Sequence, residues 1–391
     1  MDRLRFPSAE RQTSAICSIV WKEREPIGGE GAGEAYRVDM QHNIVRESRA
    51  QQADRLRGGA RPSLSCGVER QSVVWYTRAM VAAKRGSRRL SVRTPSRVAR
   101  VVRVDDDTLR QTLDDVRARC DVAARREADP VHFAHRYERR EDREIVALLA
   151  ASLAFGNVKA LCAKIEDALN RLGPHIAETA DDAADVHGRL AGFRHRLYSG
   201  KDVAHLVVGA RAMQRAHGSL AAPFVQAMAM GKPFRSAVQA WVHELRERGG
   251  FPAMGSRESL GADHLLPDPT KGSALKRLML FLRWMIRPAD GIDLGLWNIS
   301  PAHLVIPLDT HIHKLSRNIG LTLRKAADFQ AAEEITAALA RLDADDPVKY
   351  DFSLCHLGML QSCPSRKDIE RCQGCGVKPI CRHWVVLSKR R

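Results

Sequence analysis

Four cysteines near the end of the chain, Cys363, Cys372, Cys375 and Cys381, have the spacing C-x8-C-x2-C-x5-C. Short spacers of this kind let neighbouring thiolates converge on one metal centre. Two ligation schemes fit the spacing, a [4Fe–4S] cluster held by four thiolates or one structural zinc ion held by the same four. The sequence therefore predicts a metal centre here and leaves both schemes open.

A second group that could do chemistry is the carboxylate of Asp309, which stands in the run Pro-Leu-Asp-Thr-His-Ile. Asp309 lies between an apolar approach and a predicted helix over Thr310–Asn318, so it suits the N-cap position of that helix. Its carboxylate could also stabilise a developing positive charge or activate a nucleophile. His311 and His313 face different ways on a helix, so they are not predicted to form a metal site.

The elements that must position these groups read as helices, and no strand-like alternation of useful length occurs. The run over residues 144–155 is apolar on nearly every side, which predicts a helix buried all round that ends at Gly156. Another helix is predicted after Ser273 as N-cap, with a basic stripe of Lys276, Arg283 and Arg287 at one edge. Phosphate could reach this stripe, although an ordinary solvated face has the same pattern. The predicted fold is all-α.

Two aspartates further along the chain, Asp328 and Asp346, are predicted to cap the next two helices. Pro347 directly after Asp346 suits the first position of a helix. Both aspartates are therefore interpreted as structural residues.

The composition favours a polyanionic partner, because the 391 residues carry a net charge of +17. More than half of this charge lies in residues 1–105, a region without lasting helical or strand periodicity. We expect a basic, disordered extension there. Its stretch Lys84 to Arg103 contains no acidic residue and could hold phosphates, although a solvated tail has the same composition.

No apolar run is long enough to cross a bilayer, and the first thirty residues lack the apolar core of a secretory signal. The cysteines outside the cluster show no pairing pattern, which is typical of a reducing compartment. We expect a cytoplasmic monomer without a membrane partner.

The stretch from Asp309 to Cys381 resembles the last part of the helix-hairpin-helix DNA glycosylases, especially endonuclease III and the adenine glycosylases. Leu308–Ile312 matches the motif that carries their catalytic aspartate, and Leu357-Gly358 followed by the cysteine loop matches their [4Fe–4S] motif. Their loop usually has six residues between its first two cysteines, whereas this one has eight. More closely, the chain resembles an uncharacterised bacterial family of that superfamily with the strings KRL, FLRWM, LGLW, PLDTH and DPVKYDF.

The resemblance implies two helical subdomains within residues 106–391. One spans about 141–304 with a degenerate hairpin, and the other combines 106–140 with 305–391 and carries the four-cysteine loop. It implies that Asp309 is catalytic and that duplex DNA is the partner. The DNA contacts that we expect are Lys271, Gly272, Ser273, Lys276 and Arg283. Phe155 stands where the superfamily places a residue that enters the base stack, so it is either a wedge between bases or a core phenylalanine.

The superfamily hairpin reads Leu-Pro-Gly-x-Gly, but here only Leu266-Pro267 remains of it, and the position of the Schiff-base lysine holds Ser273 or Ala274. We therefore expect a DNA-binding, glycosylase-like base-excision repair protein that cleaves the N-glycosidic bond of a damaged base with Asp309 and without a lyase step. Two alternatives stay open: a non-catalytic DNA-binding module on the same scaffold, and a zinc-clipped interaction protein without a nucleic-acid partner.

Overall fold

The structure is a computed structural model that describes residues 104–385. All described residues belong to one compact unit. The predicted extension over residues 1–105, including its basic stretch Lys84 to Arg103, lies outside the described residues except for Val104 and Asp105.

The described part consists of helices with two very short strands, which confirms the all-α prediction. Its α-helices are α2 (Asp106–Ala118), α3 (Val122–Glu127), α4 (His132–His135), α5 (Arg140–Leu153), α6 (Val158–Leu172), α7 (Ile176–Thr179), α8 (Ala183–Arg189), α9 (Gly200–His217), α10 (Ala221–Ala229), α11 (Phe234–Arg248), α12 (Leu260–Leu265), α13 (Lys276–Ile286), α14 (Thr310–Asn318), α15 (Phe329–Ala340) and α16 (Asp351–Leu360). Single 3-10 turns are η2 (Arg257–Ser259), η3 (Pro301–His303) and η4 (Lys378–Ile380). Strands β1 (Arg194–His195) and β2 (Tyr198–Ser199) form an antiparallel hairpin.

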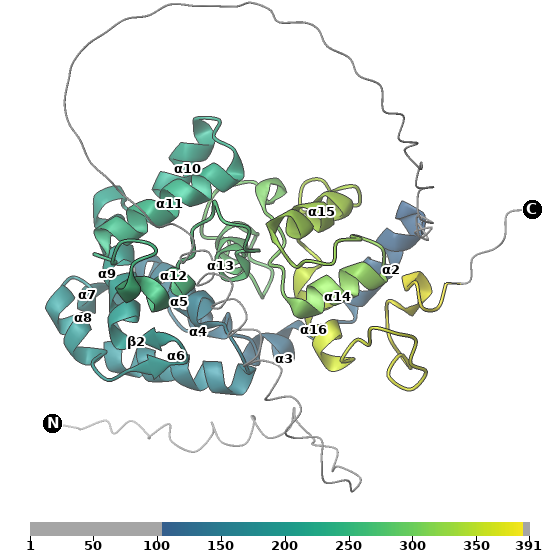
Figure 1. Ribbon diagram of the computed structural model, residues 1–391, viewed down its shortest axis with the longest axis horizontal. Coiled ribbons are helices and arrows are strands. Elements are labelled where there is room, and N and C mark those ends of the chain that lie inside the picture. Colours follow the sequence, from purple (N-terminus) through teal and green to yellow (C-terminus); the bar gives the residue numbers. More distant parts are fainter. Residues whose placement is uncertain (1–103, 386–391) are drawn as a thin grey trace, which may run out of the picture. The chain divides into compact units, whose positions relative to one another are not determined.

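Helix α5 is the centre of the first group of helices. It contacts α4, α6, α7, α9 and α13, and α9 in turn packs against α8 and α11 (Figure 1). Every residue from Glu144 to Leu153 is buried, which confirms the predicted helix with apolar contacts all round. The other predicted helix, after Ser273, is α13, and it packs directly on α5.

The side chain of Glu144 is buried within this group and fully hydrogen-bonded. The carboxylate of Glu144 accepts hydrogen bonds from the Ser219 hydroxyl (2.6 Å), the Leu220 amide (3.0 Å), the Gln214 amide group (3.0 Å) and the Trp297 indole (3.0 Å). Four neutral donors, with the Arg140 guanidinium at 3.5 Å, satisfy a carboxyl group that is only 1% exposed. This set ties α5 to the end of α9 and to the loop after α13.

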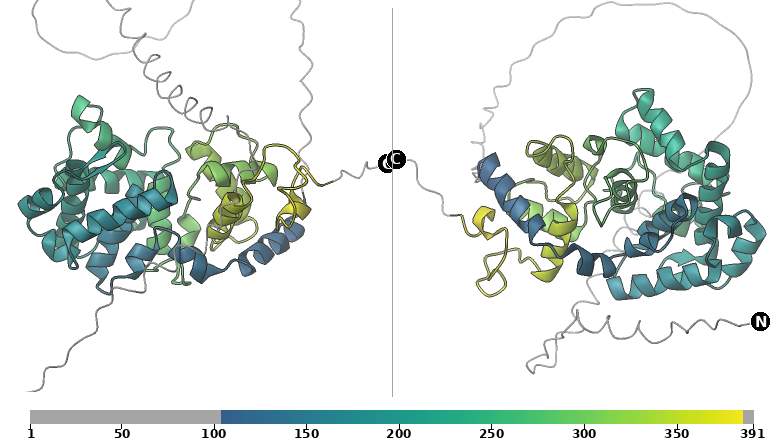
Figure 2. Two further views of the ribbon diagram at one scale, coloured as in Figure 1. Left: turned by 90° about the horizontal axis from the view of Figure 1, so that it is seen from below. Right: turned by 180° about the vertical axis from the view of Figure 1, so that it is seen from behind.

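A second group consists of α2, α14, α16 and η4 (Figure 2). Helix α16 contacts both α14 and α2, and α2 also contacts η4, which ends one residue before Cys381. The close approach of α16 to α14 depends on Gly358, because a Cβ atom there would lie 3.2 Å from the Cβ atom of His311. The glycine thus brings the middle of α16 next to the beginning of α14.

The predicted cap of α15 is confirmed, whereas the predicted cap at Asp346 is wrong. The Asp328 carboxylate accepts a hydrogen bond from the Ala331 amide at 2.8 Å. Helix α16 begins only at Asp351, and Asp346 instead pairs with Arg287 at 2.9 Å. A buried guanidinium therefore takes the carboxylate that the sequence assigned to a helix end.

The end of α5 also differs from the prediction. The helix ends at Leu153 with Ala154 as its C-cap, and Gly156 follows at a φ of 108°, outside the αL conformation of a helix cap. Asn157 serves the next helix, because its side chain accepts a hydrogen bond from the Ala160 amide at 3.2 Å. The Gly-Asn pair connects two helices and does not cap the first.

Candidate functional site

Asp309 lies at the amino end of α14 and is half-buried. Its Oδ1 atom accepts hydrogen bonds from the backbone amides of His311 (2.9 Å) and Ile312 (2.8 Å). The predicted N-cap geometry is confirmed, and the local cause is a short polar side chain in extended backbone before the helix. The amides hold one oxygen of the carboxylate and leave the other for a different partner.

That partner is Cys355 on α16, whose thiol donates to Oδ2 of Asp309 with an Sγ–O distance of 3.5 Å. Burial raises the pKa of Cys355 well above its usual value, and the charges of Asp309 and Asp351 raise it further. The sulfur therefore stays a protonated, weak donor. The sequence gives no sign that Cys355 lies beside Asp309, because a contact across 46 residues leaves no local signal.

Further ionisable groups surround this pair. Burial and the charge of Asp309 raise the pKa of Asp351 to about 6, although Arg283 opposes the shift. One oxygen of Asp351 is buried and has no hydrogen-bond partner among the described residues. Lys276 is close enough for its charge to favour the thiolate of Cys355. The site therefore combines two carboxyl groups, a thiol and an ammonium group.

Asp129 lies behind this cluster, with its carboxylate 3.7 Å from the His356 ring nitrogen. Its burial alone would raise its pKa, but the nearby His356 ring and the Val131 amide, which donates to Asp129 at 3.0 Å, lower the pKa overall. Asp129, in the turn between α3 and α4, is thus held as an anion beside His356 of α16, the helix that carries the thiol.

The prediction that Arg283 contacts DNA is wrong. Its side chain is 2% exposed and pairs with Asp293 at 3.1 Å and with Asp351. The same holds for Arg287 of the predicted stripe, which is buried among Asp290, Asp293 and Asp346. Helical spacing gives the direction of these side chains, but it does not show that carboxylates from another segment lie opposite them.

The loop before α13 remains available at the surface. Lys271, Gly272 and Ser273 are exposed, and Lys276 is half-buried.

The prediction that Ser273 caps α13 is wrong, since the helix begins at Lys276 after Leu275 with a φ of 53°. Ser273 instead forms an isolated antiparallel bridge with Asp328. The chain adopts left-handed backbone at a leucine, a conformation that normally favours glycine.

Phe155 is half-buried, and its ring lies between two guanidinium groups. Arg196 lies 4.9 Å and Arg277 lies 5.9 Å from the ring centroid. Burial lowers the pKa of Arg277 to about 10, and no carboxylate of the described residues pairs with it. Leu197, beside Arg196 in the turn between β1 and β2, is 60% exposed. Sequence reasoning missed these neighbours of Phe155, because β1 and β2 are too short to show alternation.

All four predicted cysteine ligands line one small cavity, so the structure brings the predicted set together. Burial raises the pKa values of Cys363, Cys375 and Cys381. Three N–H donors oppose this: the Asn318 side chain, 3.3 Å from the Cys363 sulfur, the Val377 amide toward Cys375 and the His383 amide toward Cys381.

The donor set fits a soft metal centre, because four sulfurs surround one space and N–H donors stabilise thiolates. Within residues 104–385, no group of three or more His, Cys, Asp or Glu side chains has the arrangement that holds a metal ion. The four cysteines thus share one cavity without the close convergence of ligand atoms that a bound metal requires.

The described part is thus a two-group helical protein with an aspartate site next to α13 and a four-thiol loop at its end. The chain belongs to the family described as "Protein of unknown function (DUF2400)", whose model matches residues 129–360, more than half of the chain. The matched range includes Asp309 and Cys355 and ends before Cys363. No curated protein and no solved structure matches the chain.

From Val104 to Val385, no helix has both the length and the apolar character needed to span a membrane.

Proposed function

We propose that this chain is a DNA-binding, glycosylase-like base-excision repair protein that cleaves the N-glycosidic bond of a damaged base. The observation that carries the proposal is the arrangement of Asp309. Two backbone amides fix its Oδ1 atom, and among the described residues Oδ2 has the weak thiol of Cys355 as its one donor. A carboxylate fixed in this way keeps lone pairs free for a reacting group.

In the proposed reaction the bond between the base and its sugar breaks, and positive charge develops on the sugar ring. The Asp309 carboxylate stabilises this charge, or it accepts a proton from the attacking water. Its position at the helix amino end fixes its orientation before the substrate binds. The proposal includes no lyase step, so the expected product is an abasic site in an unbroken strand.

The proposed DNA contacts lie on two exposed surfaces. Lys271, Gly272 and Ser273 precede α13, whose amino end has no side-chain cap in the described part, so its amides can bind a phosphate. Phe155 and the exposed Leu197 supply apolar groups of the kind that enter a base stack. The half-buried Lys276 lies near the aspartate and could meet the backbone of the extruded nucleotide.

The four cysteines are proposed to hold a [4Fe–4S] cluster, with a structural zinc ion as the alternative. The bound group would cross-link Cys363, Cys372, Cys375 and Cys381 and so fix the last described loop against α2 and α14. Its proposed role is structural. Hydrogen bonds to sulfur, as from Asn318 to Cys363, are a known means of stabilising such clusters.

The experiment compares the full chain with Asp309→Asn on a panel of duplexes that each carry one damaged base. We expect the substitution to lower single-turnover cleavage by roughly 10²- to 10³-fold, as for other groups that stabilise transition-state charge. DNA affinity should change little and should fall as salt concentration rises. Asp328→Asn is the matched control, because it makes the same change at the cap of α15.

A non-catalytic DNA-binding module is the second candidate. The observation that favours it is that both oxygens of Asp309 already have donors, as a purely structural cap would. Unchanged DNA binding in Asp309→Asn, with no cleavage of any duplex by the unaltered protein, would support this candidate and contradict the first.

A further inference from the structure

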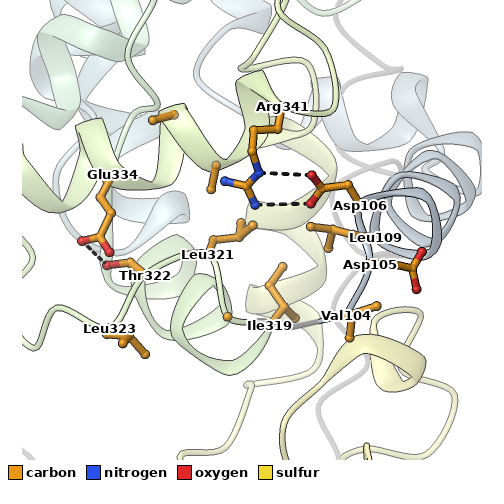
Figure 3. A pocket seen from close by; sticks show the side chains of 13 residues that line it. Val104, Asp105, Asp106, Leu109, Ile319, Leu321, Thr322, Leu323, Glu334 and Arg341 are labelled. Carbon is orange, nitrogen blue, oxygen red and sulfur yellow. Dashed lines mark hydrogen bonds and ion pairs between the residues drawn. The ribbon is translucent and has the colours of Figure 1, made fainter. Parts of the chain in front are cut away.

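A groove of about 620 Å³ lies between the start of α2, the loop after α14 and helix α15 (Figure 3). It shares no residue with the surroundings of Asp309 or with the thiol cavity. Its apolar walls are formed by Val104, Leu109, Ile319, Leu321, Leu323, Ala337 and Ala338. Leu323 is 58% exposed at the edge of the groove, so apolar surface remains accessible there.

The polar groups of the groove are mostly acidic. They comprise the carboxylates of Asp106 and Glu334 and the guanidinium of Arg341, while the carboxylate of Asp105, at the end of the groove, caps α2 by accepting from Thr108. Arg341 already pairs with Asp106, at 3.2 and 3.3 Å, and its side chain reaches across the groove in Figure 3. An occupant that matches these walls is therefore apolar and positively charged.

We propose that the groove binds the segment of this chain that leads into α2, residues 97–103. Its sequence Arg-Val-Ala-Arg-Val-Val-Arg joins three positive charges to four apolar side chains. The arginines match the excess of carboxylates, and the valines match the apolar walls.

Chain continuity selects this occupant over others. Val104, the next residue, is itself part of the groove wall, so the segment needs no linker to reach the site. Tethering at zero distance gives an effective concentration of about millimolar or more, so even a weak contact is populated. Docking would attach the end of the basic stretch Lys84 to Arg103 to the groove between α2 and α15.

The experiment measures amide hydrogen exchange in residues 319–323 of the full chain, which form one wall of the groove. The first variant, Val98→Asp with Val101→Asp, removes the apolar contacts of the segment with the groove walls. The second changes Arg97, Arg100 and Arg103 to Glu and removes the attraction of the segment to the carboxylates of the groove. Each lost ion pair corresponds to roughly a two- to fivefold change in the docking equilibrium. We expect exchange in this wall to be at least about fivefold faster in both variants. The matched control reverses Arg85, Arg88 and Arg89, which lie outside the segment.

A charge exchange makes the test specific. Glu334→Lys alone should speed exchange of this wall, and its combination with the three Arg→Glu changes should restore part of the protection. Equal exchange in the unaltered chain and in both segment variants would overturn the proposal. Protection that grows with protein concentration, with a dimer in light scattering, would also overturn it, because a second copy would then be the occupant.

Discussion

Replacement of Arg283 by methionine tests the buried charges that the sequence analysis placed at the surface. Arg283 on α13 lies between Asp293 and Asp351, and Asp351 begins α16. Methionine keeps much of the side-chain volume and removes the charge. The two carboxyl groups, 0% and 3% exposed, would then lose their shared partner.

The expected loss of stability follows from this geometry. Removal of one partner from a buried ion pair costs about 3–5 kcal/mol, because the other charge stays buried without compensation. For a folded part of this size, the loss corresponds to a decrease in Tm of roughly 6–15 °C.

The loss should depend on pH. Burial raises the pKa of Asp351 to about 6, above its unfolded value, so the folded state binds the proton more tightly. The contribution of Asp351 to stability is therefore greatest at low pH and falls as pH rises through about 6. Without Arg283 this pKa rises further, so the destabilisation should be largest at pH 8. It should be smaller at pH 5 by roughly 1–2 kcal/mol, since Asp351 can then be protonated.

The assay is thermal and urea unfolding of the full chain at pH 5 and pH 8. Arg341→Met is the matched control, because it breaks an exposed pair with Asp106 and should cost less than about 1 kcal/mol. A loss below about 1 kcal/mol for Arg283→Met, or the same loss at both pH values, would refute the reasoning.

Glu144→Ala should cost roughly 3–5 kcal/mol in a urea titration, because it leaves four buried donors without an acceptor; a loss as small as that of an exposed residue would contradict the assigned network. Gly374→Ala should cost about 1 kcal/mol, because its φ of 72° disfavours a side chain although the space is open. Ser362→Gly should raise the free energy of unfolding by about 0.5–1 kcal/mol, seen as a higher Tm, because Ser362 has a φ of 44° just after α16. A stabilising Gly374→Ala and a destabilising Ser362→Gly would exclude backbone strain as the cause. Asp328→Ala should cost about 1 kcal/mol through loss of the α15 cap, and unchanged unfolding would show that the cap is dispensable.

Local patterns in the sequence predicted much of the scaffold. The apolar run of α5, the bounds of α14 and the caps Asp309 and Asp328 all depend on neighbours within one or two helical turns. The short spacers between the last cysteines likewise predicted a shared space. These features follow from chain geometry over a few residues, which a single sequence contains.

Contacts between distant segments were not predictable in the same way. Arg283 was assigned to the surface because nothing in its helix shows that Asp351, 68 residues later, lies opposite. The thiol of Cys355 beside Asp309 depends on the close helix approach at Gly358, and the guanidinium groups around Phe155 come from two other segments. Each requires the tertiary arrangement before its chemistry can be recognised.

The four-thiol loop separates an iron–sulfur glycosylase-like protein from other helical proteins, so its content tests the proposed function most directly. The measurement is iron, zinc and acid-labile sulfide analysis with a visible spectrum on anaerobically purified full chain, with Cys372→Ser as the ligand variant and Cys120→Ser as the control. We predict about four iron and four sulfide per chain, lost in Cys372→Ser and kept in Cys120→Ser. One zinc ion without colour, or a cluster that survives Cys372→Ser, would contradict the proposal.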